Sequence, residues 1–161
     1  MADTLGPAAG LPEVVYADGE VIFAEGRRHG EIVILVDGTV RITKDGIQIG
    51  LVDQPGAVLG EVGVLLDAPA SATATAVSEV RCLRADDPAT LWRERPELTL
   101  ALAKTLARRL DLVTSYLADL QRQYADRSDS LGVVAQVLSA LSQDCGEEME
   151  PGSEREPEAP Y

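Results

Sequence analysis

The 161-residue sequence has few of the side chains that build catalytic and metal sites. It contains one histidine, two cysteines, one tryptophan and one phenylalanine. A single histidine excludes a histidine-rich zinc cluster or a histidine-based triad within one chain. We therefore expect no enzyme activity, no metal and no cofactor, and we interpret His29, in a polar loop next to Gly30, as a surface residue.

Positive charge is also scarce. The chain has 14 Lys and Arg against 27 Asp and Glu, which gives a formal net charge of -13. Such a surface repels nucleic-acid phosphates and anionic lipids, so we expect no direct DNA binding. No apolar run approaches the ~18 residues of a membrane span. The start Met1-Ala2-Asp3-Thr4 does not resemble a secretory signal, and the two thiols Cys82 and Cys145 suit a reducing compartment. These features predict a cytoplasmic protein without membrane contact.

Most of the first 85 residues read as short strands. β-Branched runs end in glycine at intervals of roughly 8–12 residues, a spacing typical of antiparallel sandwiches and barrels. The Asp-Gly pairs at 18–19, 37–38 and 45–46 are interpreted as hairpin turns. The predicted strands lie within residues 13–19, 20–26, 32–38, 39–46, 47–56, 72–77 and 80–85.

The period changes to that of helices after Asp86. A short helix is predicted up to Pro96, and a long one follows it. Apolar residues spaced alternately by four and three form a heptad seam on the long helix, which favours a partner helix and therefore a homodimer. An amphipathic helix packed on its own barrel is the alternative, and residues 106–141 fit either one bent helix or two. The seam residues are Leu106, Leu110, Val113, Leu117, Leu120 and Tyr124.

Four segments follow from these patterns. Residues 1–12 are predicted to be an N-terminal arm or short cap, and residues 13–97 an antiparallel β-roll or jelly roll. Residues 98–143 hold the long dimerisation helix and a following helix. Residues 144–161 are acidic and rich in proline and glycine, so we expect a disordered tail. The predicted fold class is mainly β with C-terminal α.

The segment GEVGVLLDAPASAT, Gly60 to Thr73, has the residue types of a small-ligand site. Glycine allows backbone to approach a ligand closely, and the Glu61 carboxylate accepts hydrogen bonds from ligand hydroxyls. The small, hydroxyl-containing turn after Pro69 suits an anion through its N–H groups. The segment contains no basic residue, however, so any anion would lack a charged partner within it.

The sequence resembles the cyclic nucleotide-binding domain family, the sensor module of catabolite activator-type regulators, protein kinase regulatory subunits and cyclic nucleotide-gated channels. The resemblance covers about residues 13–125. It rests on the opening GEVIFAEG, the strand pair EIVILVDGTVRI, the pair Gly60-Glu61 and the stretch from Pro69 to Thr73. The run ALAKTLARRLDLVTSYLADLQ is similar to the dimer helix of the activator branch. The acidic tail stands where that branch continues into a helix-turn-helix, so a stand-alone module is expected.

The resemblance implies a phosphate-binding cassette at residues 59–73. Glu61 takes the position of the carboxylate that accepts from the ribose hydroxyl. Ala70 stands where the family usually has the arginine that binds the cyclic phosphate. Thr114 resembles a polar position that contacts the base in the activator branch. The expected ligand contacts are Gly60, Glu61, Val62, Ala70, Ser71, Ala72 and Thr114.

Three explanations of the missing arginine remain open at this point. The pocket binds a nucleotide weakly through backbone groups and Glu61, another basic side chain substitutes, or the pocket has been given up. The candidate substitutes are Arg27, Arg28, Arg81 and Arg84.

We interpret the chain as a dimeric sensor with a degenerate cassette that takes cyclic AMP, cyclic GMP or a related small molecule. It would signal to a separate protein effector by a population shift. One alternative is a ligand-free scaffold that keeps the fold as an interaction surface. Another is a truncated relative that forms mixed dimers with a full-length regulator.

Overall fold

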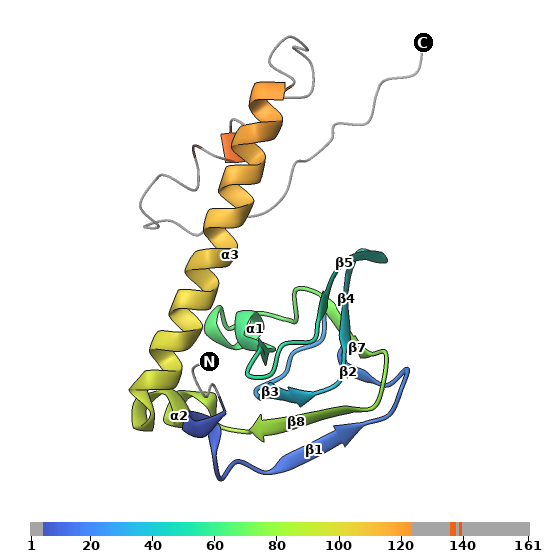
Figure 1. Ribbon diagram of the computed structural model, residues 1–161, viewed down its shortest axis with the longest axis vertical. Coiled ribbons are helices and arrows are strands. Elements are labelled where there is room, and N and C mark those ends of the chain that lie inside the picture. Colours follow the sequence, from blue (N-terminus) through green and yellow to red (C-terminus); the bar gives the residue numbers. More distant parts are fainter. Residues whose placement is uncertain (1–4, 124–135, 138, 140–161) are drawn as a thin grey trace. The chain divides into compact units, whose positions relative to one another are not determined.

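The computed structural model of the protein describes residues 5–123, 136–137 and 139, which fall into two compact units divided between Leu106 and Ala107. The first unit contains all the strands (Figure 1). Its strands are β1 (Glu13–Tyr16), β2 (Val21–Phe23), β3 (Ile32–Asp37), β4 (Val40–Lys44), β5 (Ile47–Val52), β6 (Val58–Leu59), β7 (Thr73–Ala76) and β8 (Val80–Ala85). The helical elements are η1 (Gly6–Ala8), α1 (Glu61–Leu65), α2 (Pro88–Glu94) and α3 (Pro96–Gln123), of which α3 begins in the first unit and ends in the second.

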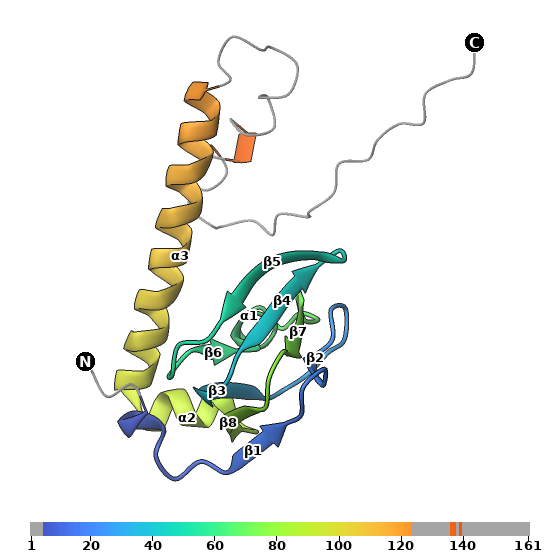
Figure 2. The ribbon, with the colours of Figure 1, turned by 45° about the vertical axis from the view of Figure 1, so that its right-hand side comes forward.

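The strands form two antiparallel four-stranded sheets. Their orders are β1-β8-β3-β6 and β2-β7-β4-β5 (Figure 2). The predicted mainly β fold, an antiparallel roll followed by a long helix, is confirmed. The two-residue strand β6 was not predicted, because so short a run shows no alternation of apolar and polar residues.

Two of the three predicted hairpin turns are wrong. Asp45-Gly46 does join the paired strands β4 and β5, with positive φ at both residues, 50° and 76°. The pairs at 18–19 and 37–38 instead join strands of different sheets, β1 to β2 and β3 to β4. An Asp-Gly pair supplies the same left-handed glycine whether the chain folds back on its neighbour or crosses to the other sheet.

The core between the sheets is built from the inward-facing residues of both. Leu35, Val40 and Val80 are fully buried there, together with Cys82. Cys82 is a packing thiol in this core, and its burial raises the pKa of the thiol to about 11.

A second cluster attaches the helices to the roll. Ile32, Ile34 and Leu91 are buried in it, and Trp92 of α2 packs against it. Ala8 of η1 is also fully buried in this cluster, and the Arg95 guanidinium donates to the carbonyl oxygen of Ala9 at 2.8 Å. The described part of the N-terminal arm, from residue 5, is therefore a packed cap.

The break between the last two helices follows from local chemistry. Asp87 caps α2 by accepting a hydrogen bond from the Thr90 amide at 3.1 Å, and hydrogen bonds from the Thr90 side chain and then from this amide hold the pKa of Asp87 below its usual value. Pro96 begins α3, so the predicted interruption there is confirmed. Tyr124, the predicted helix beyond it and the predicted tail 144–161 lie outside the described residues.

Candidate functional site

The segment from Gly60 to Thr73 contains α1, and the start of this helix is shaped by Gly60. The residue has φ 88°, a left-handed conformation that favours glycine. A Cβ added there would lie 2.8 Å from the Phe23 ring and 3.0 Å from the His29 ring. Both conformation and space therefore require glycine, which lets the chain enter α1 directly against these two rings.

Glu61, the first residue of α1, is 4% exposed. No other charged side chain is buried among the residues that the structure describes. Burying a carboxylate is unfavourable unless it is well hydrogen-bonded, although the first turn of a helix favours negative charge. The helix thus positions a carboxylate inside the roll, at the place where the resemblance puts the ribose acceptor.

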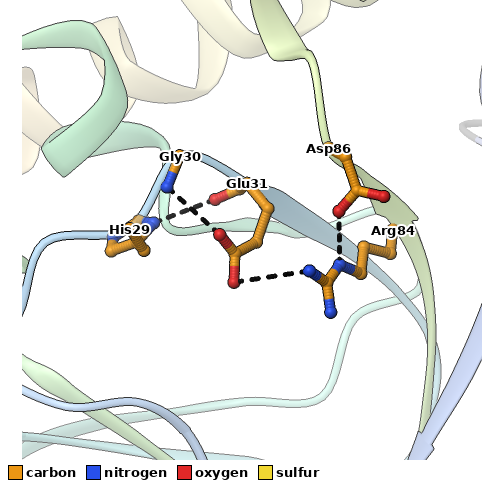
Figure 3. A network of polar contacts seen from close by, with 5 residues as sticks. All are labelled: His29, Gly30, Glu31, Arg84 and Asp86. Atoms are coloured by element: carbon orange, nitrogen blue, oxygen red, sulfur yellow. Dashed lines mark hydrogen bonds and ion pairs between the residues drawn. The ribbon is translucent and has the colours of Figure 1, made fainter.

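His29 is not the surface residue that its polar loop predicted. Its ring lies on Phe23 with ring centroids 4.2 Å apart, and Nδ1 donates to the carbonyl oxygen of Glu31 at 2.9 Å (Figure 3). Nε2 is buried and has no hydrogen-bond partner among the described residues. A Cβ on Gly63 would come within 3.0 Å of Nε2, so the histidine fills the space that two glycines of the cassette leave.

Arg84 is engaged by two carboxylates. Its Nε donates to Asp86 at 2.6 Å, and its guanidinium lies 3.8 Å from Glu31 (Figure 3). The hydrogen bond to Asp86, with the charges of both carboxylates, raises the pKa of Arg84. Arg84 therefore does not take the place of the missing arginine in this structure.

Ala70 forms part of the core. It is 7% exposed and lies in the same buried cluster as Phe23, Leu59 and Ala74. Its amide donates to the carbonyl oxygen of Arg27 at 2.9 Å, and its carbonyl oxygen accepts from the Gly26 amide at 2.9 Å. Because both hydrogen bonds are formed by backbone groups, they hold the turn whatever side chain stands at position 70.

The two residues that follow position 70 are a polar and a small one. Ser71 is exposed and Ala72 is partly buried, as is Val62 in α1. The Ser71 carbonyl oxygen accepts from the Lys44 ammonium at 2.8 Å, while the Thr73 hydroxyl oxygen accepts from the Glu25 amide at 3.0 Å. Lys44 was missed by the sequence analysis, because only the pairing of β4 with β7 brings it to this turn.

The other proposed substitutes are engaged or exposed. Arg28 lies 3.0 Å from Asp67 in an exposed ion pair, and Arg81 lies 3.1 Å from Glu13, an interaction that lowers the pKa of Glu13. Arg27 is exposed and meets Ala70 through its backbone carbonyl. Of these four arginines, only Arg27 forms no ion pair with a carboxylate of the described residues.

Thr114 lies on α3 in the second unit. Its hydroxyl donates to the carbonyl oxygens of Leu110 at 2.9 Å and Asp111 at 3.0 Å, one helical turn earlier. Its contact with a nucleotide base stays a prediction.

In the described part of the chain, no group of three or more histidine, cysteine and acidic residues is placed to hold a metal ion. Within the same residues, none of the helices combines the length and the apolarity that crossing a bilayer requires.

The chain belongs to the cyclic nucleotide-binding domain family. Residues 13–91, which include the eight strands β1 to β8 and α1 and reach into α2, match the family model of the cyclic nucleotide-binding domain. The roll is accordingly a cyclic nucleotide-binding regulatory domain, and the match includes both the buried Glu61 and the turn at Ala70.

Among curated relatives, the chain is similar to a CRP-like cAMP-activated global transcriptional regulator of Mycobacterium tuberculosis. The two are 33% identical over 142 residues, 84% of this chain and 61% of the relative. The chain thus spans about three fifths of that relative's length.

Solved structures agree with the fold. The catabolite activator protein of Thermus thermophilus superposes with a TM-score of 0.58 at 26% identity, over 88% of this chain and 83% of that one. A cyclic nucleotide-binding domain of a protein kinase regulatory subunit, solved with a cAMP analogue bound, gives a TM-score of 0.54 at 27% identity, over 71% and 75% of the two chains. The N-terminal domain of a transcriptional regulator from Streptomyces coelicolor is 30% identical over 70% of this chain and 86% of that domain, with a TM-score of 0.50.

Proposed function

We propose that this protein is a dimeric sensor that binds a cyclic nucleotide inside the roll although its cassette has Ala70 in place of arginine. The observation that carries this proposal is the buried carboxylate of Glu61, which follows a glycine that both its conformation and its surroundings require. An ionised carboxylate at the start of α1 can accept hydrogen bonds from ligand hydroxyls.

The two ends of the cassette suggest how the ligand is oriented. Glu61 accepts from the ribose hydroxyls, since an ionised carboxylate only accepts hydrogen bonds. The phosphate then lies towards the turn at Ala70, Ser71 and Ala72, where backbone groups and a hydroxyl replace the arginine fork. A hydrogen bond to a charged group is worth ~1.5–3 kcal/mol, so the absence of the fork predicts weak binding.

Isothermal titration with cyclic AMP, cyclic GMP and a cyclic dinucleotide tests ligand binding, with a thermal-shift series beside it. A ligand present at about 100 times its dissociation constant should stabilise the fold by ~2.7 kcal/mol. Glu61→Gln is the matched control, because it keeps the size of the side chain but replaces an acceptor oxygen by a donor. If no ligand of the panel gives a heat of binding or a shift in melting temperature at millimolar concentration, the ligand-free scaffold is supported instead.

The dimer would form through α3. Leu106, Leu110, Val113, Leu117 and Leu120 all lie on this helix, and the side chains of Leu110 and Val113 are about half exposed in the single chain. A heptad seam left open in this way is typical of a helix that pairs with another.

Replacing both Leu110 and Leu117 by glutamate should give a monomer, since the change places like charges in the seam. Leu112→Glu is the control, because Leu112 lies outside the seam and is 70% exposed. Multi-angle light scattering reads the mass of each variant. A monomeric parent protein at micromolar concentration would contradict the dimer.

The output of the sensor is a change in helix packing that a separate protein reads. A net charge of -13 makes a nucleic-acid partner unfavourable, so we propose a protein effector. The ligand would act by a population shift, because it can only bias conformations for which its affinity differs.

A further inference from the structure

The inner face of β4 ends in a positive charge. Val40 is fully buried and Ile42 packs against the same core, and side chains on a strand alternate between its faces. Lys44, two residues further, therefore continues the inner face at the end of the strand. Its ammonium lies 2.8 Å from the carbonyl oxygen of Ser71, the residue that directly follows Ala70.

We propose that Lys44 supplies the positive charge for the phosphate subsite that Ala70 leaves without one. This inference rests on the proposed function, since it assigns a residue to the phosphate end of the same pocket. The cation comes from a different strand, so the cassette segment itself keeps no basic residue.

The register of the sheet holds the ammonium at this turn. Thr43 of β4 pairs with Thr73 of β7, so Lys44 lies beside the residues that precede β7. The ammonium has three donors. One reaches the Ser71 carbonyl oxygen and another faces the Glu25 carboxylate at 3.8 Å, which leaves a third for a phosphate oxygen.

Glu25 sets how strongly this charge attracts an anion. Its Oε2 accepts from the Asp45 amide at 3.0 Å, and its own amide donates to the Thr73 hydroxyl oxygen. The carboxylate is thus fixed beside Lys44 and partly neutralises it. A phosphate that approaches the turn meets a lysine whose charge is shared, which fits a weaker site than the arginine fork of the family.

The charge at residue 44 is tested by titrating the full chain with cyclic AMP and, separately, with adenosine, which has no phosphate. Lys44→Met should weaken cyclic AMP binding about tenfold and leave adenosine binding unchanged. Lys44→Arg should keep most of the affinity, and raising the salt concentration should weaken the parent more than Lys44→Met. Arg27→Met is the control, because it removes an exposed cation whose backbone adjoins the same turn.

A second variant acts without changing Lys44. Glu25→Gln frees the ammonium from its neighbouring carboxylate and should tighten cyclic AMP binding about threefold, again without effect on adenosine. Because the Lys44 side chain is half exposed, Lys44→Met should melt within a few degrees of the parent.

The outcomes separate the two proposals. If the parent binds cyclic AMP and both Lys44→Met and Glu25→Gln bind it equally well, the role of Lys44 is wrong and the proposed function stands. If Arg27→Met alone loses affinity, the cation is Arg27. If the parent binds no cyclic nucleotide at all, both the proposed function and the assignment of Lys44 are overturned.

Discussion

The two ends of the cassette are built in opposite ways. At its beginning, specific contacts decide the structure: Gly60 is confined by its φ and by the rings of Phe23 and His29, and Glu61 is buried behind it. At its end, the turn at Ala70 is held by two backbone hydrogen bonds to the loop at residues 26–27. Such bonds do not depend on side-chain identity, so this end tolerates the loss of its arginine without losing its shape.

The difference shows which half of a ligand site can change without harm to the fold. A carboxylate inside a roll needs its surroundings built around it, because an unpaired buried charge is strongly destabilising. The Lys44 ammonium, by contrast, is on a half-exposed side chain of another strand, β4. We therefore expect substitutions at the start of the cassette to cost more stability than those at its end, where affinity should change as well.

The largest expected effect comes from Gly60→Ala. The new Cβ meets the Phe23 ring at 2.8 Å in addition to the strain of a left-handed alanine, so the loss of stability should reach ~3–5 kcal/mol. Gly26→Ala, in the loop that bonds to the other end of the cassette, is the matched control, because Gly26 has φ 76° but open space around its Cβ position. It should cost only ~1–2 kcal/mol in urea unfolding. Equal losses in the two variants would show that the rings do not confine Gly60.

Ala70→Arg should have the next largest effect, and its size depends on Lys44. In the Lys44→Met background, the arginine should restore ~1.5–3 kcal/mol of cyclic AMP affinity, roughly tenfold to 150-fold. In the parent the gain should be smaller, because two cations then share one phosphate. Ala70→Met is the control for size: both variants should lose ~1–3 kcal/mol of stability by overpacking a residue that is 7% exposed. Identical gains in the two backgrounds would show that Lys44 and position 70 serve different sites.

The smallest effects are expected at Asp67, midway between the two ends. Its φ of 47° is tolerated by aspartate and asparagine, and its carboxylate pairs with Arg28 while 99% exposed. Asp67→Asn should change the free energy of unfolding by less than ~0.5 kcal/mol, since an exposed ion pair contributes little. Asp67→Ala should cost ~1 kcal/mol, because alanine fits the left-handed conformation poorly. Equal losses in the two variants would mean that the ion pair, which both remove, and not the backbone conformation, fixes the middle of the cassette.

Much of the roll could be predicted from local sequence. Alternating β-branched runs mark the strands, Pro96 marks the start of α3, and apolar runs mark the buried face around Cys82. The connections at 18–19 and 37–38 could not be assigned to hairpins or crossings, because both use the same left-handed glycine. Which sheet a strand joins depends on long-range pairing.

The candidate site was predictable only where residue types repeat a family pattern. Gly60, Glu61 and Ala70 were proposed in that way and their ligand contacts stay predictions, whereas the positions of Lys44 and His29 next to the cassette were not predicted. Lys44 reaches the turn through the pairing of Thr43 with Thr73, 30 residues apart in the chain. His29 is drawn inward because Gly60 and Gly63 leave room for its ring, and no local pattern around a loop histidine reveals such a space.

The pairing of the first strand with the last has a consequence for synthesis. Glu13 of β1 lies opposite Leu83 of β8, so β1 has its one neighbour in the sheet only after some 70 further residues have been made. At roughly 5–20 residues per second, β1 leaves the ribosome several seconds before its partner exists. During that interval it is an unpaired strand edge, which other chains can pair with. Its burial pattern alternates between exposed and half-buried residues, with Glu13 at its first position. The charge of Glu13 therefore limits the pairing of β1 with neighbouring nascent chains before β8 has been made.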